Sequence, residues 1–95
     1  MLVHVVCFRY KKNIDAAART HHRERLHTLR DLDGIIDLRV GEDVVRSQRS
    51  YDTGLVIAFR DRAALDAYQT HPRHVAVAQF GPANCESVVT VDFES

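Results

Sequence analysis

The densest group of chemically capable side chains is the segment Tyr68-Gln69-Thr70-His71-Pro72-Arg73-His74. Histidine titrates near neutrality and can act as a general acid or base, and a tyrosine hydroxyl can donate a hydrogen bond to a developing oxyanion. The proline lacks an N–H and interrupts a helix, so Tyr68 and His74 lie on either side of the break. We therefore take His74 and Tyr68 as candidate catalytic residues that reach one cavity.

A structural interpretation of the same segment remains open. In it His71 caps the break in the helix, Tyr68 is a core aromatic whose hydroxyl is hydrogen-bonded, and His74 packs nearby. Perturbed titratable groups occur in structural networks as well as in active sites. The positions of these three side chains in the fold must distinguish the catalytic interpretation from the structural one.

Two further histidines lie where apolar residues are expected. His4 alternates with Leu2 and Val6 on a strand pattern, and a lone histidine there is more often a satisfied core residue than a catalyst. His22 shares the apolar stripe of a helix with Leu26. Both histidines can point into the space between helices and sheet. We predict His4, His22, Leu26 and His71 as ligand-binding residues.

The histidine spacings give only a weak metal signal. His71 and His74 are separated by two residues, and His21-His22 lies near His27. The proline inside the first pair prevents helical presentation, and no acidic or thiol partner stands beside it. The chain also has no glycine-rich phosphate loop, no G-x-S-x-G and no H-E-x-x-H. We predict no metal and no cofactor.

Composition narrows the class of protein. The 95 residues, 45% hydrophobic, suffice for one folded domain over 1–95. Thirteen basic residues balance thirteen acidic ones, which argues against nucleic acid or an anionic membrane as partner. Cys7 and Cys85 form no disulfide scaffold, and Cys7 fits a small buried hydrophobe. No segment resembles a signal peptide or a membrane span, so we expect a cytoplasmic protein.

The hydrophobic pattern predicts four strands and two helical regions. A cap at Asn13 or Asp15 begins the first helix and Asp61 begins the second, which Gly81-Pro82 ends. In the second strand we expect Ile36, Leu38 and Val40 to share one face. The predicted order is strand Leu2–Tyr10, helix Asn13–Leu32, strand Ile35–Val40, strand Thr53–Phe59, helix from Asp61 to Phe80 with a break at Pro72, and strand Val88–Phe93.

This βαββαβ order is typical of the α+β ferredoxin-like fold, a four-stranded antiparallel sheet with helices on one face. The first and third strands are apolar on both faces, yet two helices cover only one. A large exposed apolar face is unusual on a monomer. We therefore expect a second copy of the sheet to cover the other face, in a homodimer. The residues to be covered are Val3, Val5, Cys7, Val56 and Ala58.

Four segments resemble one family when taken in order. They are the strand opening with His4, SQRSYDTGLVIAF at Ser47–Phe59, LDAYQTHPRH at Leu65–His74, and VVTVDFE at Val88–Glu94. Together they resemble the stress-responsive A/B barrel (Dabb) family from end to end. The resemblance implies a ferredoxin-like subunit whose sheet packs on a second copy to form a dimeric α/β barrel.

The family resemblance also implies candidate activities. Members include plant stress proteins without known activity and a plant cyclase that closes a linear polyketide by intramolecular aldol condensation. The matching residues are His74 for its general base, Tyr68 for its substrate-binding tyrosine and His4 for a pocket histidine. His22, Arg23 and Leu26 stand where the cyclase has pocket aromatics, so a different substrate is expected.

Three functional hypotheses follow. The first is a small-ligand-binding or stress-associated dimer that takes a small, oxygenated, partly apolar molecule. The alternative is a cofactor-independent cyclase or lyase for a polyketide-like or aromatic substrate, with His74 as general base and Tyr68 as hydrogen-bond donor. A less favoured third is a monooxygenase of the antibiotic-biosynthesis type, whose group includes haem degraders. The absence of Trp and the Tyr-x-x-His-Pro-x-His segment argue against it.

Overall fold

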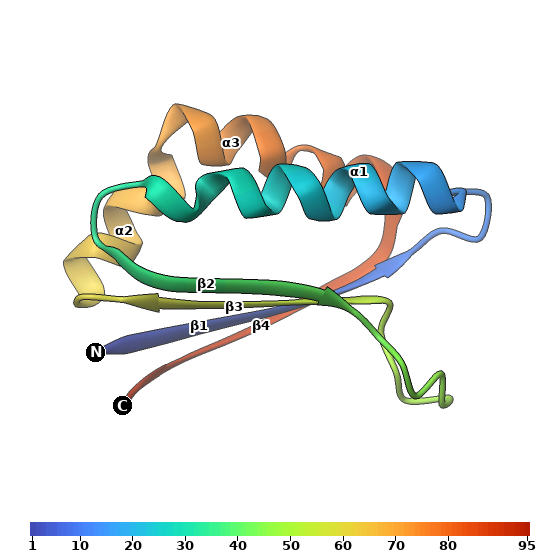
Figure 1. Ribbon diagram of the computed structural model, residues 1–95, viewed down its shortest axis with the longest axis horizontal. Coiled ribbons are helices and arrows are strands. Elements are labelled where there is room, and N and C mark those ends of the chain that lie inside the picture. The colour runs from blue at the N-terminus through green and yellow to red at the C-terminus, as the bar shows by residue number, and fades with distance from the viewer.

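The computed structural model describes residues 1–95, and its elements follow the predicted order (Figure 1). The two regions between strands are each divided into several helical segments. The elements are β1 (Leu2–Tyr10), α1 (Ala16–His27), the 3-10 helix η1 (Thr28–Asp31), β2 (Ile35–Glu42), β3 (Thr53–Phe59), α2 (Arg62–Thr70), α3 (Pro72–Ala78), α4 (Phe80–Asn84) and β4 (Cys85–Glu94).

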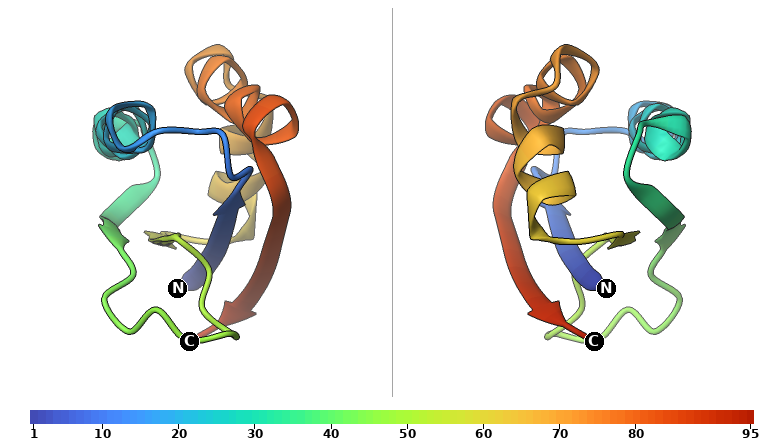
Figure 2. Two further views of the ribbon diagram at one scale, coloured as in Figure 1. Left: turned by 90° about the vertical axis from the view of Figure 1, so that its right-hand side faces the viewer. Right: turned by 90° about the vertical axis from the view of Figure 1, so that its left-hand side faces the viewer.

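The four strands form one antiparallel sheet in the order β2-β3-β1-β4, with β1 and β3 at its centre. All helices lie on one face of this sheet, and the opposite face carries no element (Figure 2). Figure 1 also shows that the chain between β2 and β3 extends beyond the end of the sheet. The predicted ferredoxin-like α+β fold with one covered face is confirmed.

The faces of β1 follow the predicted alternation. Leu2, His4 and the next alternate side chains are buried beneath the helices, whereas Val3, Val5 and Cys7 are only half-buried. Successive strand residues point to opposite faces, so the period-2 pattern determines which side chains meet the helices. Within one subunit Cys7 is half-buried, because no helix covers its face of the sheet.

Of the three β2 residues expected on one face, Leu38 and Val40 share the inner face as predicted, but the prediction is wrong for Ile36. A bulge between Ile35 and Asp37 shifts the pairing with β3, so Ile36 is 61% exposed whereas Leu38 is 4% exposed. A bulge places two residues opposite one and takes the extra residue out of the alternation. Ile35 packs against the core in place of Ile36.

The first helix begins where a capping residue permits. Asp15 accepts a hydrogen bond from the Ala18 N–H at 2.8 Å, so the helix starts at Ala16 rather than Asn13. It tightens into η1 and ends before Gly34, which has φ of 88°. A Cβ at Gly34 would lie 2.6 Å from the Ala64 Cβ, so a glycine is required there for both reasons.

The second helical region breaks at Pro72 as predicted, but it does not end at Gly81-Pro82. These two residues lie in the first turn of α4, where a missing proline N–H breaks no intrahelical hydrogen bond. The chain passes directly from α4 into β4, which begins at Cys85 rather than Val88. This short helix therefore lies directly beside the start of the edge strand.

The hydrophobic core lies between the sheet and the helices. Its most enclosed side chains come from the two central strands and from η1, namely Tyr10, Leu29, Ile57 and Phe59. No helix is long and apolar enough to cross a membrane. The core fills much of the space under the helices and leaves a cavity beside the edge strand β4.

Candidate functional site

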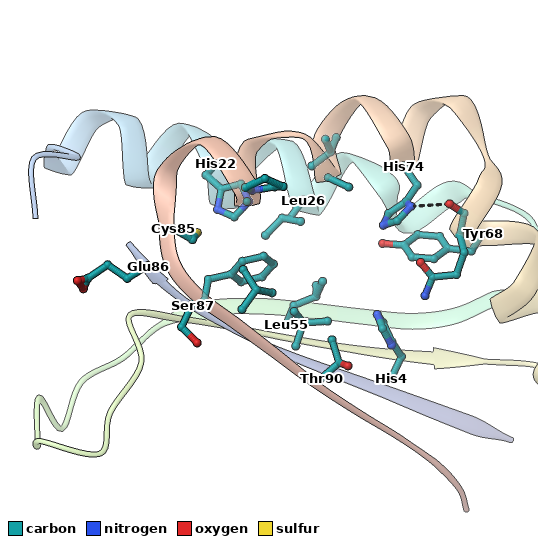
Figure 3. A pocket seen from close by; sticks show the side chains of 18 residues that line it. His4, His22, Leu26, Leu55, Tyr68, His74, Cys85, Glu86, Ser87 and Thr90 are labelled. Atoms are coloured by element: carbon teal, nitrogen blue, oxygen red, sulfur yellow. Dashed lines mark hydrogen bonds between the residues drawn. The ribbon is translucent and has the colours of Figure 1, made fainter. Parts of the chain in front are cut away.

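A cavity of about 460 Å³ lies between the inner face of the sheet and the helices. Its wall includes His4 from β1, His22 and Leu26 from α1, Tyr68 from α2 and His74 from α3 (Figure 3). Five of the six residues predicted to form a site thus line one cavity, although they are widely separated in sequence. Their chemical roles stay predictions.

Apolar side chains form much of the wall between the polar groups. In Figure 3, His22 and Cys85 lie at one end of the cavity, His4, Tyr68 and His74 gather at the other, and Leu26 and Leu55 lie between them. A wall that is apolar with a few inward polar groups is typical of small-molecule sites. The remaining apolar lining includes Val6, Phe8, Val77 and Val88.

Tyr68 has a buried ring but an unpaired hydroxyl. The residue is 3% exposed, and its ring centroid lies 4.1 Å from that of His74. The hydroxyl has no hydrogen-bond partner in the protein, yet every fully enclosed polar side-chain atom does have one. The hydroxyl is therefore open to the cavity. Burial raises the Tyr68 pKa, which keeps the phenol protonated and able to donate a hydrogen bond.

His74 presents a neutral imidazole to the same end of the cavity. Burial is the main cause that lowers its pKa, with smaller contributions from His4 and His71, against the carbonyl of Gln69. The Nδ1 atom lies 3.3 Å from that carbonyl oxygen, which can only accept. The proton then resides on Nδ1, and Nε2 carries a lone pair that can accept a proton.

Sequence reasoning missed a carboxylate that holds one of the cavity histidines from outside the cavity wall. Asp92 on β4 is paired directly opposite His4 on β1, and its carboxylate bonds the His4 Nδ1. A carboxylate bonded to one ring nitrogen fixes the orientation of a histidine. The available signal was an acidic residue within the apolar strand segment VVTVDFE. The pairing of β1 with β4 that places Asp92 beside His4 could not be predicted from the neighbouring residues in the sequence.

His22 is bonded in a buried network at the opposite end. Its Nδ1 lies 2.7 Å from the Tyr10 hydroxyl, which lies 2.9 Å from the Thr53 hydroxyl. The Arg23 guanidinium donates a hydrogen bond to the Thr53 hydroxyl at 3.1 Å. Arg23 itself does not line the cavity. The His22 ring stacks on Phe80 at 4.3 Å. Burial, with Arg25 and Arg23, lowers the His22 pKa to about 4.

His71 is the one predicted ligand-binding residue outside the cavity wall. Its Nδ1 accepts a hydrogen bond from the Arg73 N–H at 3.1 Å and so caps the start of α3. His71 therefore has the capping role that the structural interpretation assigned to it. Its position outside the cavity wall does not support a contact with a ligand. No group of three or more histidine, cysteine or acidic side chains is arranged to hold a metal ion.

The fold and the cavity define a ferredoxin-like protein with a partly polar pocket beneath its helices. The model of the Stress responsive A/B Barrel Domain, Dabb, matches residues 2–95, and the chain belongs to this family. The resemblance seen in the sequence is thereby confirmed. A search of curated proteins gave no match.

Several solved structures are similar over nearly the whole chain. A dimeric ferredoxin-like protein of unknown function from a Jannaschia species is 28% identical, with a TM-score of 0.83 and coverage of 99% of this chain and 98% of that one. Another from Thermobifida fusca is 21% identical, with a TM-score of 0.90 and coverage of 99% and 90%. A hydroxynitrile lyase from Passiflora edulis is 15% identical, with a TM-score of 0.86 and coverage of 97% and 90%.

Proposed function

We propose that this protein is a homodimer that binds a small, oxygenated, partly apolar molecule in the cavity of each subunit. The observation that carries the proposal is an open cavity of about 460 Å³ with apolar walls into which the unpaired Tyr68 hydroxyl opens. A closed core around Tyr68 would have argued for packing alone. The volume suits a compact ligand such as a substituted aromatic ring.

The dimer follows from the uncovered face of the sheet. Val56 on β3 and the alternate β4 residues Val89, Val91 and Phe93 are exposed large hydrophobic side chains. They pair across the strands with half-buried apolar residues of β1, such as Val5 opposite Val91. A contiguous apolar face is best covered by an identical face in a two-fold dimer. The similar proteins from Jannaschia and Thermobifida fusca, described as dimeric, support this assembly.

Sedimentation of Val5→Asp tests the assembly. The residue is in the centre of the uncovered face, so a buried carboxylate should convert the dimer to a folded monomer. Lys12→Asp, an exposed substitution beyond the end of β1, is the matched control and should leave the dimer unchanged. An unchanged dimer for Val5→Asp would exclude the sheet face as the interface.

A second candidate function is cofactor-independent acid–base catalysis of the cyclase or lyase kind. Its support is the arrangement of a neutral His74, a protonated Tyr68 and His4 at one end of the cavity, with Asp92 bonded to His4 from outside the wall. His74 would remove a proton next to a carbonyl, while Tyr68 would donate a hydrogen bond to the resulting enolate oxygen. The hydroxynitrile lyase of similar fold shows that this architecture can accommodate lyase chemistry.

Two measurements test these functions separately. Mass spectrometry of molecules released from purified dimer detects a retained ligand, and NMR then follows deuterium exchange next to the carbonyl of an aromatic ketone. Catalysis predicts that His74→Ala stays folded but loses the exchange. Packing predicts that it loses stability instead. Ligand binding without deuterium exchange would support the ligand-binding function and exclude the catalytic one.

A further inference from the structure

The ring of His22 has one nitrogen that the protein does not use. The residue is only 1% exposed, and Nδ1 is bonded to Tyr10. Nε2 has no partner in the protein, although every fully enclosed polar side-chain atom has one. The small exposed part of the residue therefore includes Nε2, and the space that His22 lines is the cavity.

The network behind His22 determines which nitrogen carries the proton. Arg23 can only donate, so Thr53 Oγ1 accepts from it at 3.1 Å. The Thr53 hydroxyl then donates to Tyr10 Oη, and the Tyr10 hydroxyl donates to His22 Nδ1. Since Nδ1 is an acceptor in this arrangement, the proton of the neutral ring is on Nε2.

The opposite tautomer leaves a buried proton without an acceptor. If His22 Nδ1 donated to Tyr10, the Tyr10 hydroxyl would have to donate to Thr53. The proton of Thr53, a residue 1% exposed, would then have no acceptor, because its oxygen contacts only Tyr10 and Arg23. Such a buried unpaired donor is unfavourable.

We propose that the Nε2–H of His22 is a second hydrogen-bond donor of the cavity, so that the ligand has an acceptor oxygen near each end and an apolar middle. One oxygen meets the Tyr68 hydroxyl and the other meets His22, with Leu26 and Leu55 between them (Figure 3). The inference rests on the proposed binding function and specifies its ligand class. Burial lowers the His22 pKa to about 4, so this donor is uncharged at neutral pH.

Two aromatic probes of similar size measure the second donor. para-Diacetylbenzene has a carbonyl at each end, and para-isopropylacetophenone replaces one carbonyl oxygen with a methyl group. By calorimetric titration the wild-type dimer should bind the diketone about fivefold more tightly, as one neutral hydrogen bond predicts. Equal affinities would overturn the inference while leaving cavity binding intact. Binding of neither probe would remove the proposed function and the inference with it.

Matched variants assign any preference to the correct side chain. His22→Phe keeps an aromatic ring against Phe80 but has no donor, so the preference for the diketone should vanish while para-isopropylacetophenone still binds. Leu26→Met changes the same wall at nearly constant volume and should keep the preference. A preference that survives in His22→Phe would exclude His22 as its source.

The tautomer itself can be measured in the unmodified protein. Nitrogen-15 NMR of the imidazole distinguishes a protonated ring nitrogen from an unprotonated one, without any variant that must fold. We expect a protonated Nε2 and an unprotonated Nδ1 in His22 at neutral pH. A proton found on Nδ1 would overturn the inference whatever the probes do.

Discussion

Histidine and tyrosine side chains occur at or behind both ends of the cavity, but their hydrogen bonding differs. At one end, His22 is almost fully enclosed and its Nδ1 belongs to a chain of bonded hydroxyls. At the other, the Tyr68 hydroxyl has no partner and His74 has one long bond to a carbonyl. A polar atom with a partner inside the protein contributes to stability, whereas an atom without one, such as the Tyr68 hydroxyl or the His22 Nε2, can still form a hydrogen bond. The presence of histidine alone would not distinguish these ends, because both contain it.

The largest expected contrast is in stability. His22→Ala removes a buried ring from between Phe8 and Phe80 and leaves the Tyr10 hydroxyl without an acceptor, which should cost about 4 kcal/mol of unfolding free energy. His74→Ala removes a half-buried ring and should cost about 1 kcal/mol. Urea unfolding of both variants measures the difference. Equal losses of unfolding free energy would mean that His22 and His74 contribute equally to the stability of the fold.

Acid should destabilise the protein through the enclosed end. The unfolded chain protonates His22 near its ordinary pKa of 6.5, whereas the folded protein does so only near 4. The stabilisation is therefore complete above about pH 6.5 and is lost as the pH falls toward 4, by roughly 3 kcal/mol. The lowered pKa of His74 acts in the same direction.

Urea unfolding between pH 7 and pH 4 measures this dependence. His22→Phe cannot take up a proton, so its stability should fall less steeply than that of the wild type. His21→Phe is the control, because His21 is an exposed neighbour on the same helix. If the two variants fell equally, the buried network would not determine the acid response.

A smaller effect is expected from the carboxylate that pairs with His4. Asp92→Asn keeps the shape of the side chain but loses the charge-assisted hydrogen bond, which should cost about 1 kcal/mol in urea unfolding. Glu94→Gln, on the same strand and with no salt bridge, should change the stability by less than about 0.5 kcal/mol. Equal effects would show that the pair contributes nothing beyond surface charge.

The smallest stability effect should come from the tyrosine with the free hydroxyl. Tyr68→Phe should change the unfolding free energy by less than about 0.5 kcal/mol, because no bond within the protein is lost. Tyr10→Phe should cost about 1–2 kcal/mol, since that hydroxyl bonds His22 and Thr53. Thermal or urea unfolding compares the pair. A large loss of unfolding free energy in Tyr68→Phe would mean that the Tyr68 hydroxyl contributes to the stability of the fold.

Local sequence signals predicted the elements well where they act over a few residues. The capping residues Asp15 and Asp61, the break at Pro72 and the alternation of β1 all depend on neighbours in the chain. The prediction was wrong at Ile36, where a bulge depends on pairing with β3, and at Gly81-Pro82, which begins a helix instead of ending one. A period-2 pattern does not reveal an extra residue.

The sequence by itself determined the element order, the strands that are apolar on both faces, and the histidines that point into the space between helices and sheet. Alternation and capping are local properties of the chain, so they can be recognised without the fold. Only the tertiary structure decided which of these residues have partners. Asp92 meets His4 across 88 residues of sequence, and His22 meets Tyr10 and Thr53 through separate elements. Hydrogen-bond satisfaction depends on distances between strands and helices. That dependence, rather than residue type, separates the end of the cavity where His22 belongs to a bonded network from the end where the Tyr68 hydroxyl has no partner.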